Sequence, residues 1–297
     1  MAFNHASLVR PNSFKLIHEI GQALDKGLES DLIYLDFEKA FDSVCHTKLL
    51  AKLECYGICH PLLKWFKRYL HGHLQRVVIN GLCSAWKHVK SRVPQGSLLG
   101  LILFLIYVDD MPNVTTGSTL AMFADDSKCY KCIESIADFD IIQADLDKLL
   151  CLSLANEMNF QPSKCENLRV SRKRISPVHS YSLDSTSLKV VSSVKDLGIM
   201  VTKDLTWSNH VRYVSATANH MLGFIKTNCA GIINKDVLKL LYVSLVCSHL
   251  CQHQTSMLIM EVEKVQRRAS QFICKNNKLS YKDRLTSLNL LPIKLLP

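Results

Sequence analysis

The sequence lacks an apolar run long enough to cross a membrane. Its longest such run, LLGLILFLIYV at Leu98–Val108, has eleven residues, whereas a membrane-spanning helix needs about 20. The run therefore predicts a buried element, and we expect no membrane partner. The amino-terminal stretch also lacks the apolar core of a secretory signal, so we do not expect a secreted protein.

Internal repeats and low-complexity linkers are also lacking, which argues against a repeat array. Apolar residues make up 48% of the chain, so a disordered protein is excluded as well. A chain of 297 residues can bury the core of one large domain or two smaller ones. The twelve cysteines are scattered through apolar stretches, which favours reduced thiols over a disulfide framework.

Acidic residues are too few to balance the basic ones, and the formal net charge is +10. Lys and Arg displace counterions from phosphates, so a basic surplus favours a polyanionic partner. By charge alone, nucleic acid and an anionic membrane surface both fit.

Hydrophobic periodicity predicts strands and helices in the first two thirds of the chain and helices afterwards. Helices are expected at Phe14–Leu24 (stopping at Gly27), within Lys48–Leu70 with a break near Gly57 and Pro61, and at Ala137–Leu154 with Ile141, Leu146, Leu149 and Leu150 inward. Strands are expected at Asp31–Phe37, Gln75–Trp86 (a hairpin turning at Asn80–Gly81), Leu120–Asp126 and Lys189–Val201. This order predicts an α+β fold with a helical appendage, divided into residues 1–204 and 205–297.

Two acidic positions follow apolar strands, one at Asp36 and one at Asp125–Asp126. A carboxylate there is unfavourable unless a positive group meets it. Each position alone is compatible with a strand cap or a turn, but the two together suggest a shared cation. Magnesium prefers a few carboxylates plus substrate phosphates. Two such ions about 4 Å apart can activate an attacking oxygen and neutralise a leaving one.

The residues around these acids carry a resemblance. YLDFEKAFDSV (Tyr34–Val44), VPQGSLLG (Val93–Gly100) and FADD (Phe123–Asp126) occur in the order of motifs A, B and C of reverse transcriptases. Further matching pieces are HTKLLAKLECYGI, KWFKRYL, QRVVING, FLIYVDDMP, NFQPSKC, VKDLGIMV, LTWSNHV and VEKVQRRA. From about residue 20 to its end, the chain resembles the polymerase region of non-LTR (LINE-type) retrotransposons.

The resemblance implies a right-hand polymerase: a palm with an antiparallel sheet and packed helices, partial fingers, and a helical thumb-like region. It implies an RNA-directed DNA polymerase working by two-metal nucleotidyl transfer. The expected cofactor is a pair of Mg²⁺ ions, with Mn²⁺ as a substitute. The expected partners are an RNA template, a DNA primer and deoxynucleoside triphosphates; oligomeric state is left open.

The resemblance also assigns roles by position. The catalytic acids are Asp36, Asp125 and Asp126, and the metal ligands are Asp36, Asp125 and the backbone of Phe37. The nucleotide-binding residues are Phe37, Glu38, Phe41 as steric gate, Gln95, Gly96 and Lys164. The template or primer residues are Pro94, Leu197, Gly198, Lys264, Arg267 and Arg268. For Phe41, packing in the core without a role in nucleotide selection remains an alternative. For Lys164, Lys264, Arg267 and Arg268, the alternative is a side chain that is merely exposed to solvent.

Two Cys/His groups and one basic run could suggest binding sites, but we favour purely structural roles for them. The pair Cys129 and Cys132, and the patch Cys247, His249, Cys251 and His253, lack the four ligands at workable spacing that zinc requires. The basic run Arg169–Arg174 fits a nucleic-acid contact or a nuclear address, but a solvated loop is the preferred interpretation.

The chain departs from the family in several places. Only 35 residues precede Asp36, Leu101 stands where the family has proline, and Val246–Met260 looks degenerate. We expect no endonuclease domain within these residues. We therefore expect a fragment of a longer element, localised to the nucleus by family biology or otherwise to the cytoplasm. The alternatives are an inactive remnant that at most binds nucleic acid, or another right-hand polymerase such as a group II intron maturase.

Overall fold

The structure, a computed structural model, describes residues 12–292 except 73, 89–90, 95, 174–178, 233, 251–258 and 276–277. It divides into two compact units, Met1–Ser192 and Ser193–Pro297, and each is described by itself. This division is by compactness alone, so the domain boundary expected at 204/205 stays a prediction. Within the described residues, no helix combines the length and apolarity that a bilayer crossing demands.

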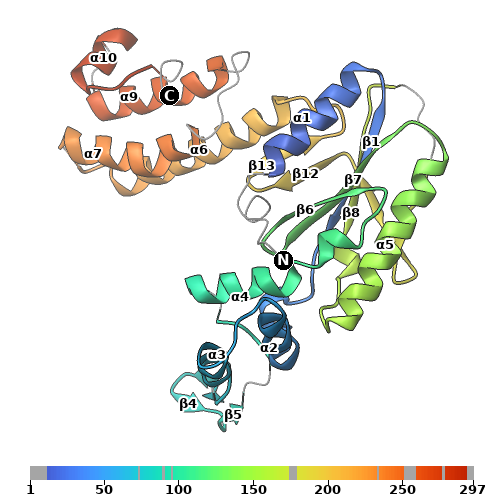
Figure 1. Ribbon diagram of the computed structural model, residues 1–297. Helices are drawn as coiled ribbons and strands as arrows, with labels where there is room; N and C mark the ends of the chain where they lie inside the picture. Colours follow the sequence, from blue (N-terminus) through green and yellow to red (C-terminus); the bar gives the residue numbers. More distant parts are fainter. Residues whose placement is uncertain are drawn as a thin grey trace. The chain divides into compact units, whose positions relative to one another are not determined.

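A five-stranded sheet forms the centre of the first unit (Figure 1). Its strand order is β11–β8–β1–β7–β6, and every neighbouring pair is antiparallel except β11 with β8. The strands are β1 (Glu29–Leu35), β6 (Thr119–Phe123), β7 (Asp126–Ile133), β8 (Glu166–Val170) and β11 (Lys189–Val191). A small hairpin of β9 (Ser182–Leu183) and β10 (Thr186–Ser187) stands apart from this sheet.

Strand β1 is central because it is apolar on both faces. Leu32 and Ile33 are fully buried, and alternate residues of a strand point to opposite sides of the sheet. On the Leu32 side lies α1 (Asn12–Asp25), whose Glu19 accepts a hydrogen bond from the Tyr130 hydroxyl at 2.7 Å. On the other side lies α5 (Ala137–Ala155). Because helices cover β1 on both faces, its sequence is a nearly continuous apolar run.

The first unit also carries a largely helical segment between β1 and β6. It comprises η1 (Ala40–Asp42), α2 (His46–Cys55), α3 (Leu62–Leu70), α4 (Leu98–Val108) and η2 (Met111–Asn113). Between α3 and α4 runs a ribbon of short strands, β2 (Leu74–Gln75), β3 (Val78–Ile79), β4 (Leu82–Cys83) and β5 (Lys87–His88). The hairpin expected at Asn80–Gly81 is present, with both residues at positive φ (49° and 82°), as a two-residue turn between strands requires.

Helix α4 is buried on one face only. Leu103, Phe104 and Tyr107 are fully buried, whereas Leu98 is 76% exposed and Ile102 43% exposed. The sequence could not show this, because the run is apolar all round and has no polar face to mark the solvent side.

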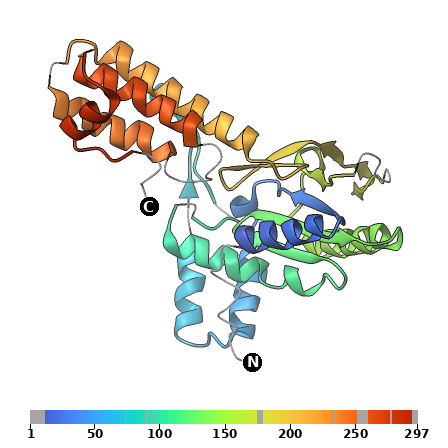
Figure 2. The same cartoon turned by 90° about the horizontal axis from the view of Figure 1, so that it is seen from above.

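The second unit has its own core. It begins with a hairpin of β12 (Ser193–Asp196) and β13 (Ile199–Thr202). Helices follow: α6 (Ser208–Asn228), α7 (Lys235–Leu241), the π-helical η4 (Tyr242–Cys247), α8 (Ser248–Leu250), α9 (Ile259–Cys274) and α10 (Tyr281–Ser287). Ala218 of α6, Leu238 of α7 and Val265 of α9 are fully buried together. The expected helical character after residue 205 is thus confirmed, and Figure 2 shows these helices from above.

Three sequence expectations were wrong in detail. The strand expected at Leu120–Asp126 ends at Phe123, because the chain turns at Ala124 and Asp125 into β7. Strand β1 ends at Leu35 rather than Phe37. In α5 the inward residue is Ile142, which is fully buried, whereas Ile141 is 37% exposed. Ile141 instead lies against the loop before β6, because its Cγ2 atom would be 2.2 Å from a β-carbon placed on Gly117.

A buried ion pair connects β1 to β8. Asp31 is fully buried, and the Arg169 guanidinium binds both of its carboxylate oxygens at 2.7 and 2.6 Å. The Tyr181 hydroxyl donates to the same carboxylate at 2.7 Å. The pKa of Tyr181 is raised, mainly by burial and secondly by the negative charge of this carboxylate. Charge-assisted contacts of this kind compensate the desolvation of Asp31.

We predict that Arg169→Ala lowers the free energy of unfolding by about 3–5 kcal/mol, because it leaves the Asp31 carboxylate buried without its cation. Arg172→Ala is the matched control: its pair with Asp25 is exposed and contributes about 1 kcal/mol or less. Urea unfolding of both variants measures the difference. Equal stability of the two would contradict the role given to Asp31.

Candidate active site

The acids predicted from the sequence meet at one end of the sheet. In the antiparallel pairing of β1 with β7, Leu35 lies opposite Ser127, so continuing this register by one residue brings Asp36 beside Asp126. Asp125 is in the turn that joins β6 to β7. Neighbouring strands lie only about 4.8 Å apart. Residues about 90 positions apart along the chain are therefore neighbours here.

The turn that carries Asp125 has an unusual backbone. Phe123 pairs with Asp126, which leaves Ala124 and Asp125 as a two-residue connection. Ala124 has φ 53°, a conformation uncommon for residues with a β-carbon. Such strain is characteristic of functional sites, where the surrounding structure holds a residue in place.

The backbone of Asp36 is fixed from the β8 side. Its carbonyl accepts a hydrogen bond from the Gln161 N–H at 2.8 Å, and its N–H donates to the Cys165 Sγ atom at 3.4 Å. The Asp36 carboxylate forms an ion pair with the Lys164 ammonium at 3.1 Å. The structure therefore brings Lys164, a predicted site residue, directly to the predicted acid.

The geometry of Phe37 bears on its predicted backbone role. Phe37 forms an isolated antiparallel bridge with Phe160, made by the Asp36 carbonyl and the Glu38 N–H. In such a pair the carbonyl and N–H of the bridged residue itself point to the opposite side. The Phe37 carbonyl thus points away from Phe160, toward the side of β1 on which β7 lies. Its ring is buried and stacks on that of Phe160 at 4.5 Å.

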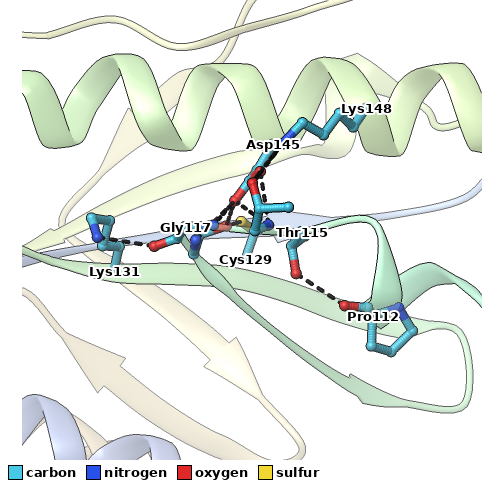
Figure 3. A network of polar contacts seen from close by, with 9 residues as sticks. Pro112, Thr115, Gly117, Cys129, Lys131, Asp145 and Lys148 are labelled. Carbon is cyan, nitrogen blue, oxygen red and sulfur yellow. Dashed lines mark hydrogen bonds and ion pairs between the residues drawn. The ribbon is translucent and has the colours of Figure 1, made fainter.

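A buried carboxylate anchors the loop that leads into β6 (Figure 3). Asp145 of α5 is 1% exposed and accepts hydrogen bonds from the backbone N–H groups of Thr116, Gly117 and Ser118 at 2.8–3.2 Å. The Lys148 ammonium lies 2.9 Å from it. Burial alone would raise the pKa of Asp145, but the hydrogen bonds from Lys148 and the loop outweigh burial and hold the pKa well below its usual range.

We predict that Asp145→Asn lowers the free energy of unfolding at neutral pH by on the order of 3 kcal/mol, because loop N–H groups lose a charged acceptor. The pKa of Asp145 is lowered on folding, so the ionised form adds stability above its unfolded pKa of about 3.9, and this stability is lost at lower pH. The difference in the free energy of unfolding between wild type and variant, measured by urea unfolding, should therefore shrink below about pH 4.

The exposed neighbour Asp147 is the control residue for this experiment. Asp147→Asn should change stability by less than about 0.5 kcal/mol. If the stability difference between wild type and Asp145→Asn stayed constant from neutral to acid pH, the stabilising role given to the ionised Asp145 carboxylate would be contradicted.

The loop of the VPQG motif is held against the start of α4. The Ser97 hydroxyl donates to the Pro94 carbonyl at 3.0 Å and accepts from the Gly100 N–H at 2.9 Å. Gly96 has φ 87°, a region that favours glycine. Gln95, another predicted site residue, lies outside the described residues. Phe41, the predicted steric gate, is half-buried and stacks on Phe104 at 4.5 Å.

Gly100 is required by the same packing. A β-carbon placed there would lie 2.1 Å from the Pro94 carbonyl oxygen. We predict that Gly100→Ala displaces this loop and destabilises the protein by about 1–3 kcal/mol. The control Gly223→Ala meets nothing within 4 Å in α6 and should be neutral or stabilising by up to about 1 kcal/mol. Thermal melts test both, and a neutral Gly100→Ala would contradict the close contact.

The remaining predicted residues belong to the second unit. Leu197 and Gly198 form the turn of the β12–β13 hairpin, both at positive φ (46° and 88°). The three basic residues of α9 have partners within that unit. Lys264 pairs with Glu261 at 2.5 Å, the Arg267 guanidinium lies 4.8 Å from the centre of the Tyr281 ring, and Arg268 donates to Asn219 at 3.1 Å.

The patterns set aside on sequence grounds have ordinary structural roles. Cys129 is buried, and burial raises the pKa of its thiol to about 12. Of the second Cys/His patch, Cys251 and His253 lie outside the described residues. Among the residues described, no three His, Cys, Asp or Glu side chains are grouped as a metal site, and the eleven cysteines in that part of the chain are free thiols. Arg169 is not in a solvated loop, since it lies in β8 and pairs with the buried Asp31.

Comparison with known proteins decides the family. The model of the reverse transcriptase (RNA-dependent DNA polymerase) family matches residues 2–222. The chain belongs to this family. The expected α+β polymerase fold is confirmed, and the apo telomerase of Candida tropicalis has a similar fold, with a TM-score of 0.51 at 11% identity, covering 96% of this chain and 51% of that one.

The curated relatives come from mobile elements. The chain is 28% identical over 208 residues to a probable RNA-directed DNA polymerase from transposon X-element of Drosophila melanogaster, covering 66% of this chain and 22% of the relative. It is also 28% identical over 198 residues to the RNA-directed DNA polymerase from mobile element jockey of Drosophila funebris, covering 64% and 21%. The resemblance to non-LTR retrotransposon polymerases is thereby confirmed, and the chain spans about a fifth of the length of these relatives.

Several residues that shape the site were not singled out from the sequence. Asp31, Asp145 and Cys165 each hold an element that positions a predicted acid. The one available signal was an acid inside an apolar strand or on the inward face of an amphipathic helix, since such a carboxylate requires a buried partner.

Proposed function

We propose that this chain forms the polymerase centre of an RNA-directed DNA polymerase of the non-LTR retrotransposon type. The observation that carries the proposal is the strand register, in which Asp36 lies next to Asp126 and Asp125 occupies the adjoining turn. Family membership supports it. Working from this site, the protein would extend a DNA primer along an RNA template with deoxynucleoside triphosphates.

The donor set fits a pair of hard divalent cations. Asp36, Asp125 and the carbonyl of Phe37 would supply oxygen ligands, with Asp126 beside them. Mg²⁺ prefers oxygen ligands, including carboxylates, and Mn²⁺ accepts the same donors. When bound, two such ions would activate the primer hydroxyl and neutralise charge on the leaving pyrophosphate. The ammonium of Lys164 now neutralises Asp36, so a cation there would release it.

Other side chains around the acids then have definite tasks. Lys164, once released, would donate a proton to the pyrophosphate. Glu38 and the backbone of Phe37 would lie along the triphosphate, with Gln95 and Gly96 also at the nucleotide. The Phe41 ring would exclude a ribose 2′-hydroxyl, the group that distinguishes the two sugars. Pro94 would contact the template.

The second unit would hold the duplex. Leu197 and Gly198 at the hairpin turn would grip the primer, and Lys264, Arg267 and Arg268 would contact phosphates, where a cation gains most from released counterions. Copying at a chromosomal site would require this protein in the nucleus.

A primer-extension assay on an RNA template with Mg²⁺ tests the proposal. We predict extension by the wild type and a loss of at least about a thousandfold in Asp125→Asn, since removing a metal ligand forfeits several kcal/mol of charge stabilisation. The control Asp184→Asn should be unchanged, because Asp184 is an exposed turn residue at φ 49°, where asparagine is well tolerated. No extension by the wild type would favour the inactive, nucleic-acid-binding remnant.

A further inference from the structure

The positive charge of the chain is concentrated in one segment. Residues 55–108 contain no Asp or Glu, yet they hold seven Lys and Arg residues and four His. In the remaining sequence, Lys and Arg exceed Asp and Glu by only three. Seven of the ten net charges therefore come from 54 of the 297 residues. We refer to residues 55–108 as the acid-free segment.

This segment folds as α3, the ribbon β2–β5 and α4. Figure 1 shows α3, β4 and β5 on the side of α4 away from the five-stranded sheet. Of its six described Lys and Arg side chains, Arg92 pairs with Asp42 at 3.2 Å. The other five are exposed: Lys64, Lys67 and Arg68 on α3, and Arg76 and Lys87 on the ribbon. None of these five takes part in any ion pair formed between described residues. Their charge is thus available to an external anion.

Exposed rings accompany these cations. Trp65 of α3 is 49% exposed and stacks on Tyr69 with centroids 5.4 Å apart. Trp86 of the ribbon is 57% exposed, and the Arg76 guanidinium lies 4.6 Å from the centre of its ring. Cations next to open aromatic faces suit a ligand with both phosphates and flat bases.

We propose that the acid-free segment binds single-stranded RNA, as a surface for the template strand separate from the carboxylate site. The inference rests on the proposed function for the identity of the strand. An unpaired strand is favoured over a duplex because only unpaired bases can stack on Trp65 and Trp86. A polyanion is favoured over a protein because an apolar protein partner would not require a segment without a single acid.

Fluorescence anisotropy of a labelled single-stranded RNA with the full chain tests this surface. Measured in EDTA and without nucleotides, binding does not depend on the metal site. We expect Lys64→Gln/Lys67→Gln/Lys87→Gln to bind about tenfold or more weakly at 0.1 M salt. The slope of log Kd against log salt should fall by about 2, since each single-strand phosphate contact contributes roughly 0.7.

The matched control is Lys26→Gln/Lys189→Gln/Lys203→Gln, which removes the same charge from exposed positions outside the segment. It should keep the wild-type affinity to within about twofold. Equal weakening by the two triple variants would overturn the proposal, because binding would then follow net charge alone.

A second pair of variants tests the rings. Trp65→Ala and Trp86→Ala should each weaken binding of single-stranded RNA by about tenfold and leave binding of duplex RNA unchanged. Tighter binding to duplex than to single strands, or wild-type self-association without RNA binding, would overturn the proposal. Intact RNA binding with no primer extension would count against the proposed function alone.

Discussion

The pairing of β1 with both β7 and β8 is the constraint on which the site depends. A shift of one residue in either register would turn every side chain of β1 to the other face. A shift between β1 and β8 would also take Asp31 away from Arg169 and Tyr181, leaving a buried carboxylate without partners. The buried ion pair therefore fixes the register of β1 with β8, while the pairing of β1 with β7 puts Asp36 beside Asp126. In this way an interaction outside the candidate site helps to hold the strand that leads into Asp36, one of the predicted catalytic acids.

Each acid is supported by a separate part of the first unit. Asp36 is held through its own backbone by Gln161 and Cys165. Asp125 depends on β6, and the loop that enters β6 is tied to α5 by Asp145. Supports built on helices and strands hold a functional group more closely than a free loop does. The site is thus preorganised by hydrogen bonds that lie several residues away from the carboxylates.

Much of the fold was predictable from local pattern. The apolar run of β1, the Asn80–Gly81 turn and the helices after residue 205 follow from periodicity and turn chemistry. The meeting of Asp36 with Asp125 and Asp126 followed from the ordered motifs, because strand pairing between residues so far apart has no local signal. The structure shows these residues as neighbours, whereas their metal-binding role stays a prediction.

Other features depend on contacts that the sequence cannot reveal. Asp31 and Arg169 are 138 positions apart, so the sequence does not show which cation pairs with Asp31. The phase of α5 was misjudged by one residue because Ile141 packs on the loop at Gly117, and helical periodicity tolerates such a rotation. Helix α4 had no polar face that could indicate which of its leucines are exposed.

Diffraction from crystals soaked in Mn²⁺ and a deoxynucleoside triphosphate tests the central claim most directly, since anomalous scattering locates manganese without ambiguity. The account predicts manganese bound by the carboxylates of Asp36 and Asp125, with Lys164 moved off Asp36. Manganese elsewhere on the protein, with the Asp36–Lys164 pair intact, would contradict it.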